Sequence, residues 1–335
     1  MKYNILGHSG TAVSPICLGT MMFGGQTSEK EALRIIDHAA DHGVNFIDTA
    51  DVYEEGRSEI ITGKGIQKTR DKWILATKLG NSVSDDPNGQ ALSRKRIMDG
   101  IDQSLVRLNT DYIDIYYLHK PAFRASFEEI VMAMGDLIRN GKIRHFAVSN
   151  LRGWQIAALT QLCRQHNIPQ PACCQPYYNL LNRQPEVEVL PACRHYNIGV
   201  VPYSPIARGV LTGKYRPGEN PGKNTRAGRN DKRIMQSEWR QESLNIAQKI
   251  KEFIKDRDIN LAQFAFAWVL SNKSVTSTIA GPRTYEQWCD YFPALDFSCT
   301  RQDEEFIDAL VAPGHASTQF YSDPAYPVEG RFAKA

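Results

Sequence analysis

Short apolar runs alternate with amphipathic stretches along the whole chain. Eight of the runs have the length and composition of buried strands. They cover residues 16–20, 44–48, 73–77, 112–118, 143–148, 172–175, 199–203 and 277–280. Several of them, such as residues 199–203, are apolar throughout, which is typical of parallel strands that are covered on both faces.

Helical patterns lie between most of these runs. Over residues 29–42 the apolar positions recur at helical spacing and share one face; these positions are Ala32, Ile35, Ile36, Ala39 and Ala40. Eight β/α units in one chain predict the α/β class and a (β/α)8 TIM barrel rather than a doubly wound sheet. The first strand is not followed by G-x-G-x-x-G, so the Rossmann dinucleotide fingerprint is missing.

Three stretches lie outside the repeat. Residues 2–15 are expected to form a β-hairpin that turns at Ser9-Gly10. Residues 205–239 are expected to form a long loop after the seventh strand, rich in Gly, Arg, Asn and Lys, and residues 313–335 a C-terminal tail. The tail carries four aromatic side chains: Phe320, Tyr321, Tyr326 and Phe332. We expect residues 1–335 to form a single barrel domain.

Composition narrows the choice of partners and compartment. Forty basic residues against 37 acidic residues give a net charge of +3, which does not predict a nucleic-acid or membrane-surface partner. The seven cysteines have no C-x-x-C spacing and are expected to be reduced thiols. The N-terminal residues lack an apolar signal region, so a soluble, cytoplasmic protein is expected.

Barrel enzymes carry their chemistry at the C-terminal ends of the strands. Asp48, Lys78 and His119 stand at or just after such ends, and Tyr53 follows Asp48 by five residues. A lysine ammonium beside a phenol favours the phenolate, and a carboxylate paired to that ammonium keeps it charged and oriented. Tyr53 is therefore the candidate general acid toward a carbonyl oxygen, and His119 is expected to orient the same oxygen without any metal ion.

A series of short motifs runs from the first strand into the long loop. Its main members are Leu18-Gly19-Thr20-Met21, Asn45-Phe46-Ile47-Asp48-Thr49-Ala50 with Tyr53, Ala76-Thr77-Lys78, Leu118-His119, Val148-Ser149-Asn150, Tyr203-Ser204-Pro205 and Gly209-Val210-Leu211-Thr212-Gly213-Lys214-Tyr215. Through them the chain resembles the aldo-keto reductase superfamily over nearly its whole length. It looks most like the bacterial-type branch of this superfamily. The potassium-channel β-subunit group shares the long loop and the motifs in it.

The resemblance implies an oxidoreductase that reduces an aldehyde or ketone with NADPH. It places Tyr53 at the proton-donor position and Asp48, Lys78 and His119 beside it. Tyr203 would stack under the nicotinamide, and Ser149, Asn150 and Gln175 would bind its carboxamide. The loop of residues 204–214 would cover the pyrophosphate, and Arg208 and Lys214 would supply charge to it. The full set of implied cofactor contacts is Gly19, Thr20, Met21, Asp48, Ser149, Asn150, Gln175, Tyr203, Ser204, Pro205, Ile206, Ala207, Arg208, Gly209, Lys214, Gly281, Arg283, Gln287 and Asp290.

Residues 281–290 resemble the family's adenosine-phosphate site at the start of the last helix. Arg283 would bind a 2′-phosphate there, which favours NADP over NAD. Gln287 and Asp290 would face the adenine, although Tyr291 stands where an Asn is common.

Two other functions are compatible with the sequence. One is an NADPH-binding regulatory or partner subunit with residual reductase activity. The other is a lyase or aldolase that uses Lys78 as a Schiff-base amine. The carbonyl substrate, the direction of the reaction and the oligomeric state stay open. Four side chains, Met22, Phe23, Tyr53 and Trp154, are expected as pocket walls together with parts of the 205–239 loop. The tail aromatic residues either close the pocket or pack outside the barrel.

Overall fold

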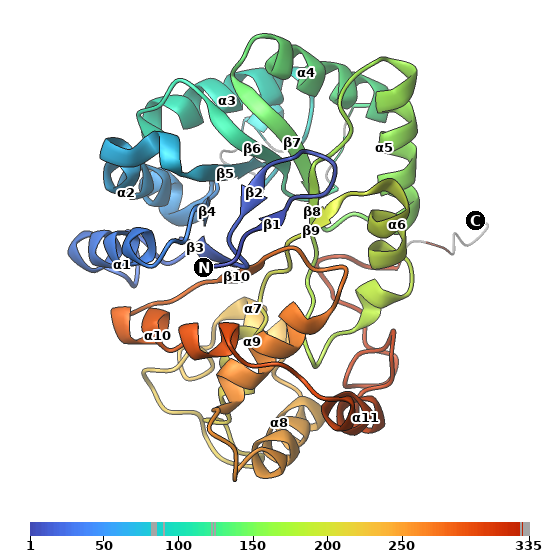
Figure 1. Cartoon of the computed structure of the whole chain (residues 1–335). Helices are drawn as coiled ribbons and strands as arrows, with labels where there is room; N and C mark the ends of the chain where they lie inside the picture. Colours follow the sequence, from blue (N-terminus) through green and yellow to red (C-terminus); the bar gives the residue numbers. More distant parts are fainter. Residues whose placement is uncertain (82–85, 90, 122, 124, 329, 331–335) are drawn as a thin grey trace.

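The computed structural model describes residues 1–81, 86–89, 91–121, 123, 125–328 and 330. Within these residues, eight parallel strands form one curled sheet at the centre of the molecule (Figure 1). In sheet order they are β10 (Thr278–Ala280), β3 (Ile16–Gly19), β4 (Phe46–Asp48), β5 (Ile74–Leu79), β6 (Ile113–Leu118), β7 (Ile143–Ser149), β8 (Cys173–Gln175) and β9 (Gly199–Val200).

The sheet closes on itself between its first and last members. The Ile279 amide in β10 donates to the Pro202 carbonyl just beyond β9, over 3.0 Å. The prediction of a (β/α)8 barrel is therefore confirmed, and each observed strand lies within or overlaps an expected run. The strands could be located from the sequence because parallel strands covered on both faces are apolar along their whole length.

Helices surround the barrel and alternate with its strands. In chain order they are α1 (Glu29–Asp41), α2 (Arg57–Ile66), α3 (Arg94–Leu108), α4 (Phe127–Arg139), α5 (Gly153–Gln165), α6 (Val189–Tyr196), α7 (Lys232–Ser237), α8 (Gln241–Phe253), α9 (Leu261–Ser271), α10 (Tyr285–Cys289) and α11 (Arg301–Leu310). Serine hydroxyls at positions 28, 93 and 126 cap the N-termini of α1, α3 and α4. Ala40 is exposed, against expectation, because it lies about a quarter turn from the centre of the buried stripe of α1.

The apolar side chains form two layers. The outer layer fills the space between the sheet and the helices. The inner layer fills the barrel itself and includes Cys17, Phe46, Ile115, Tyr117 and Ala147. Because the interior is filled, a site that is accessible to solvent can form only at one of the two ends of the barrel.

The expected N-terminal hairpin closes one of these ends. β1 (Asn4–Ile5) pairs antiparallel with β2 (Ala12–Val13) and lies across the strand ring in Figure 1. Leu6 and Val13 are fully buried and join the inner layer. The hairpin thus plugs the N-terminal end, and the C-terminal end is left for a site.

The segment after the seventh strand is more structured than expected. Residues 205–239 contain the 3-10 stretch Ala207–Thr212 and helix α7, so they are not a plain loop. The described part of the tail extends to residue 328 and includes residue 330; Phe332 lies outside the described residues. All seven cysteines are free thiols, and five of them are buried. In the described part of the chain, no helix combines the length and the apolar character that crossing a membrane requires.

Gly7 provides a test of how tightly the hairpin is seated. A Cβ at this position would lie 2.5 Å from the Gly199 nitrogen and 2.8 Å from the Ala172 carbonyl oxygen, at a φ of +55°. Gly10 has a φ of +71° but no atom within 4 Å of a Cβ. We expect Gly10→Ala to cost about 1–2 kcal/mol of unfolding free energy from backbone strain alone. Gly7→Ala should cost about 1–3 kcal/mol more because of overpacking.

Urea denaturation of both variants measures this difference. Equal midpoints for Gly7→Ala and Gly10→Ala would contradict the seating of the hairpin against β8 and β9.

Candidate active site

The register of two neighbouring strands sets the positions of the first three candidate residues. Asp48 ends β4 opposite Ala76 of β5, and Lys78 lies two residues further along β5. Beyond Asp48 the chain continues beside β5, because the Thr49 amide donates to the Ala76 carbonyl over 2.9 Å and the Asp51 amide to the Lys78 carbonyl over 3.1 Å. This path brings Tyr53 over the side chain of Lys78.

The Lys78 ammonium has an acceptor for each of its three N–H groups. It donates to Asp48 Oδ2 over 2.5 Å, to the Thr49 carbonyl over 2.7 Å and to the Tyr53 hydroxyl over 3.1 Å. The side chain is fully buried beneath Tyr53 and does not line the open cavity. Its geometry leaves the Tyr53 proton free to be donated into the cavity.

Charge and burial act in opposite directions on these groups. Burial alone would lower the pKa of Lys78, but Asp48 and Tyr53 outweigh it and hold that pKa above its usual value. Burial raises the pKa of Tyr53, and the Lys78 ammonium offsets only part of this rise. The expected preference for a phenolate is therefore overridden. Tyr53 is a protonated donor at neutral pH, as a general acid must be.

Asp48 has a second partner that the sequence did not indicate. The Gln175 side-chain amide donates to Asp48 Oδ1 over 3.0 Å from the end of β8. Burial raises the pKa of Asp48, while the Lys78 ammonium and the Gln175 amide pull it back. Gln175 thus has a structural task besides the carboxamide contact that the resemblance implies.

His119 stands across from the phenol, and Asn81 fixes its tautomer. The His119 and Tyr53 rings meet edge to face, with centroids 6.0 Å apart. The Asn81 amide nitrogen can only donate, so at 2.9 Å it makes Nδ1 of His119 an acceptor. Burial and the Lys78 charge lower the pKa of His119 well below its usual value, and the neutral ring therefore carries its proton on Nε2.

One cavity of about 950 Å³ opens above these residues. The candidate cofactor residues line it, with the exception of Ala207, which is buried in the core. Of the expected pocket walls, Met22 and Tyr53 line the cavity and the other two do not. Phe23 is fully buried in the outer apolar layer, and Trp154 is exposed on α5, where it stacks on Phe127. Neither burial depth nor facing direction could be read from aromatic character alone.

Tyr203 forms a flat shelf at the edge of the cavity. Its hydroxyl donates to Asn150 Oδ1 over 2.8 Å, and the Asn150 amide donates to the His119 carbonyl over 2.9 Å and to the Ser149 hydroxyl over 3.0 Å. Ser149 in turn donates to the Gln175 carbonyl over 2.8 Å. One chain of hydrogen bonds therefore connects the shelf to the catalytic candidates.

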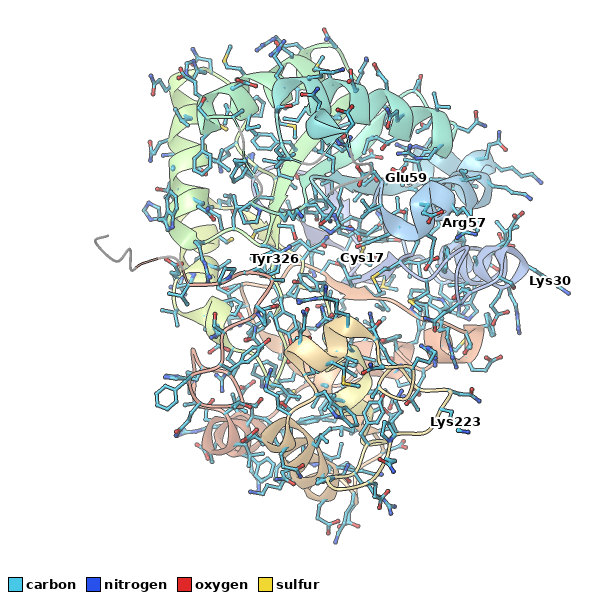
Figure 2. The ribbon with its side chains drawn as sticks, turned by 180° about the vertical axis from the view of Figure 1, so that it is seen from behind. Cys17, Lys30, Arg57, Glu59, Lys223 and Tyr326 are labelled. Carbon is cyan, nitrogen blue, oxygen red and sulfur yellow. The ribbon has the colours of Figure 1, made fainter. Side chains whose placement is uncertain are left out.

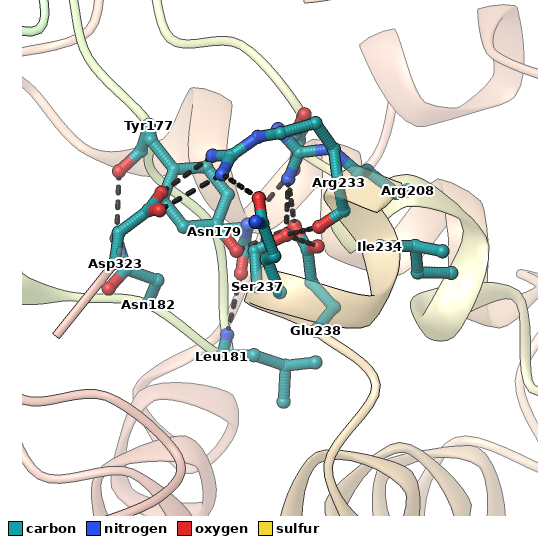
Figure 3. Close-up of polar contacts among 12 residues, drawn as sticks. Tyr177, Asn179, Leu181, Asn182, Arg208, Arg233, Ile234, Ser237, Glu238 and Asp323 are labelled. Atoms are coloured by element: carbon teal, nitrogen blue, oxygen red, sulfur yellow. Dashed lines mark hydrogen bonds and ion pairs between the residues drawn. The ribbon is translucent and has the colours of Figure 1, made fainter. Parts of the chain in front are cut away.

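Behind the shelf lies a buried polar network, drawn in Figure 3. Tyr177 lies 5.6 Å from Tyr203 between ring centroids and donates to Glu238 over 2.6 Å. Arg208 donates to the same fully buried Glu238 over 2.5 Å and to Ser237 over 2.9 Å. Arg208 thus borders the cavity with its guanidinium held by a carboxylate that lies 30 residues further along the chain.

Residues 224–226 and 229 form part of the cavity wall. Arg229 donates to Gln26 over 2.6 Å on one side and to the Asn224 carbonyl over 2.8 Å. Arg283 donates to the same carbonyl over 3.4 Å. Lys214 and Arg226 also line the cavity, which adds two further cationic groups to its wall.

The adenosine-phosphate stretch begins a helix of only five residues, α10, and α11 follows it, so it does not begin the last helix as expected. Gln287 and Asp290 line the cavity but also have internal partners: Gln287 accepts from the Arg283 amide over 2.9 Å, and Asp290 from Gln263 over 2.9 Å. Tyr291 lies between the cavity and Phe266, 5.0 Å from that ring. The residue that departs from the family pattern is therefore part of the wall.

The tail divides between the two expected positions. Tyr326 lines the cavity and lies near the centre of the face seen in Figure 2. Tyr321 packs on Arg240 outside the cavity, and Phe320 is exposed to solvent. Asp323 accepts two hydrogen bonds from Arg233 of α7, at 3.0 and 2.7 Å, which fixes the chain just before Tyr326.

Sequence comparison shows which known proteins this chain is similar to. The model of the aldo/keto reductase family matches residues 15–312. An uncharacterized oxidoreductase, YrpG, from Bacillus subtilis is 36% identical over 336 residues, which cover 96% of this chain and 100% of the relative. A probable voltage-gated potassium channel subunit beta from Oryza sativa is 34% identical over 96% of this chain and 100% of the relative. Versiconal hemiacetal acetate reductase from Aspergillus parasiticus is 29% identical over 93% of this chain and 98% of the relative.

The buried Lys78–Asp48 pair should be sensitive to loss of one partner. Lys78→Met leaves the Asp48 carboxylate buried without its counter-ion, which we expect to cost about 3–5 kcal/mol of unfolding free energy. Asp48→Asn combined with Lys78→Met removes that charge and should be less destabilising than Lys78→Met alone. Urea denaturation gives both values.

The control is Lys95→Met, which removes an exposed ion pair with Asp99 and should cost about 1 kcal/mol or less. A double variant at least as unstable as Lys78→Met would contradict the pairing.

Proposed function

Because the chain belongs to the aldo/keto reductase family, it is an oxidoreductase, and we propose that it reduces an aldehyde or ketone to an alcohol with NADPH. The observation that carries the proposal is the contact of the Lys78 ammonium with the Tyr53 hydroxyl beside His119, at the open end of a barrel. This places one proton donor and one hydrogen-bond donor around a single point.

The residues of the cavity suit an extended dinucleotide. Tyr203 supplies an aromatic shelf, and the cationic side chains of Arg283 and Lys214 line the same cavity. Tyr203 would support the nicotinamide ring, Asn150 would hold its carboxamide, and Arg283 would hold the 2′-phosphate. Because α10 has only five residues, its N-terminus adds little to phosphate binding, and the Arg283 charge is the main determinant. The bound cofactor would supply the hydride.

The side chains around the carbonyl have separate tasks. The His119 Nε2–H group donates to the carbonyl oxygen and orients it. The Tyr53 hydroxyl delivers its proton to that oxygen as negative charge develops there. The Lys78 ammonium stabilises the phenolate that remains, and its own position depends on Asp48.

The same geometry argues against Lys78 as a Schiff-base nucleophile. A nucleophilic amine must be neutral, whereas Asp48 and Tyr53 hold the pKa of Lys78 above its usual value. The amine also lies beneath Tyr53 and away from the cavity wall.

A second function is supported by similarity to probable channel β subunits from Oryza sativa and Arabidopsis thaliana, at 34% and 36% identity. In that case the chain binds NADPH as a regulatory or partner subunit of another protein and reduces carbonyl compounds only slowly. Negligible turnover on a broad carbonyl panel, together with a stable large complex recovered from cells, would favour this function over reduction.

Tyr53→Phe tests the proton donor. We expect kcat for carbonyl reduction to fall about 100- to 10,000-fold, because general acid catalysis is lost while the aromatic ring stays. The dissociation constant for NADPH, measured by fluorescence titration, should stay within about twofold. Tyr321→Phe is the matched control, since it removes a phenol outside the cavity, and its kcat should equal that of the wild type. Full activity in Tyr53→Phe would remove Tyr53 from this task.

Arg283→Met tests the choice of cofactor. We expect the dissociation constant for NADPH to rise about tenfold or more, because a charge-assisted contact with the 2′-phosphate is lost. NADH lacks this phosphate, so its dissociation constant should hardly change. Arg301→Met removes an exposed arginine on α11 and serves as the control. An equal effect on both cofactors would refute the assignment of the 2′-phosphate to Arg283.

A further inference from the structure

Behind Tyr53 lies a buried ion pair that the proposed reaction does not use. Asp51 and Arg96 of α3 form it, with side chains 3% and 6% exposed. The backbone amide of Asp51 also donates to the Lys78 carbonyl. Asp51 therefore connects the catalytic strand β5 to helix α3, two residues before Tyr53.

A second arginine of α3 holds the other end of the same segment. Arg107 donates to Glu59 of α2 over 2.6 Å, and the Thr77 hydroxyl of β5 donates to the same carboxylate over 2.6 Å. Gly56 packs directly on Arg107, since a Cβ at this position would lie 2.7 Å from Arg107 Cδ. Residues 51–59 are thus fixed at both ends by α3; Glu59 is labelled in Figure 2.

Between these two contacts the backbone is strained. Glu54 has a φ of 48° and Glu55 a φ of 58°, both in the left-handed region, and Gly56 follows at 87°. The left-handed conformation costs roughly 1–2 kcal/mol for each non-glycine residue. Such strain persists only where the surroundings impose it, and the strained residues come directly after Tyr53.

The ion pair is poorly suited to a purely stabilising task. Asp51 Oδ1 and Arg96 Nε are buried without a hydrogen-bond partner among the described residues. A buried pair with unsatisfied atoms contributes little net stability compared with apolar packing. Its place in the chain provides the better explanation, because Asp51 binds the Lys78 carbonyl through its backbone amide and comes two residues before Tyr53.

We propose that Arg96, acting through Asp51, is a positioning residue that holds the Tyr53 hydroxyl at the Lys78 ammonium, with Arg107 and Glu59 as the second anchor. The inference rests on the proposed function of Tyr53 as proton donor. Neither Arg96 nor Asp51 lines the cavity, so they act on the reaction only through the segment that carries Tyr53.

Protonation of Asp51 should release the first anchor. Burial raises the pKa of Asp51 to about 6, and Arg96 lowers it only in part. The charged or titratable groups that face it are Arg96 and Arg107 of α3, Glu59 of α2, Tyr116 of β6 and Tyr53 itself. Above about pH 6 the carboxylate is ionised and paired with Arg96, and below it the pair is lost. His119 stays neutral across this range, since its pKa is well below the usual value.

The experiment compares pH profiles of kcat between pH 5 and 8. In the wild type, kcat should rise through an inflection near pH 6. Asp51→Asn mimics the protonated state, so its kcat should be roughly 10- to 100-fold lower at pH 7.5, without that inflection, as for a small misplacement of a reacting group. Arg96→Met removes the ion pair at every pH, so its kcat at pH 7.5 should fall to a similar extent and its profile should also lack the inflection near pH 6. KM and NADPH affinity should stay within about twofold.

Arg94→Met is the matched control. Arg94 lies on the same helix and pairs with Asp136 at the surface, so its removal should leave kcat and its pH profile unchanged. Thermal unfolding at pH 7.5 shows whether each variant is folded at the assay temperature. A folded Asp51→Asn protein with wild-type kcat and the inflection near pH 6 would overturn the proposal.

A readout without turnover separates this inference from the proposed function. With tyrosine labelled at 13Cζ, the Tyr53 signal is assigned by its absence in Tyr53→Phe. It should shift in Asp51→Asn and Arg96→Met and not in Arg94→Met. If the wild-type protein reduces no carbonyl but these shifts occur, the proposed function fails and the positioning stands. If turnover occurs and the Tyr53 signal is the same in all variants, only the positioning fails.

Discussion

The structure of the site depends on an ammonium group that is completely removed from water. Burying such an ion costs several kcal/mol unless its charge and its three donors are matched. Asp48 supplies the counter-charge, the Thr49 carbonyl supplies a second acceptor, and the Tyr53 hydroxyl supplies the third. Because Lys78 needs all three, the end of β4 and the turn after it are held in one arrangement. The proposed proton donor, Tyr53, is therefore positioned by the same contacts that stabilise the buried lysine.

The barrel makes this arrangement possible through its parallel strands. Each strand carries residues at or next to its C-terminus to the same end, so that β4, β5, β6 and β8 bring Asp48, Lys78, His119 and Gln175 together. The opposite end is closed by the hairpin, and the interior is packed with apolar side chains. Segments between the strands and helices then extend the site outward, from the Tyr203 shelf to the cationic groups around Arg283.

Much of this arrangement could be predicted from the sequence, for a physical reason. Strands covered on both faces are marked by apolar runs, and their order fixes which polar residues meet. The convergence of Asp48, Tyr53, Lys78 and His119 follows from that rule. Contacts between side chains distant in sequence carry no such signal. The pairing of Gln175 with Asp48, the capture of Arg208 by Glu238 and the burial of Phe23 depend on packing that periodicity does not encode. The place of Tyr326 in the cavity wall, in a segment held by the contact of Asp323 with Arg233, is of the same kind.

The central claim is that Lys78 is charged and Tyr53 protonated at neutral pH, in contact with each other. The most direct measurement is an NMR titration of the wild-type protein labelled at lysine 13Cε and tyrosine 13Cζ, from pH 6 to 11. The account predicts that the Lys78 signal keeps its charged position beyond the usual lysine pKa, and that Tyr53 ionises above the usual tyrosine pKa. A neutral Lys78 at pH 7, or a Tyr53 that ionises below the usual value, would contradict it.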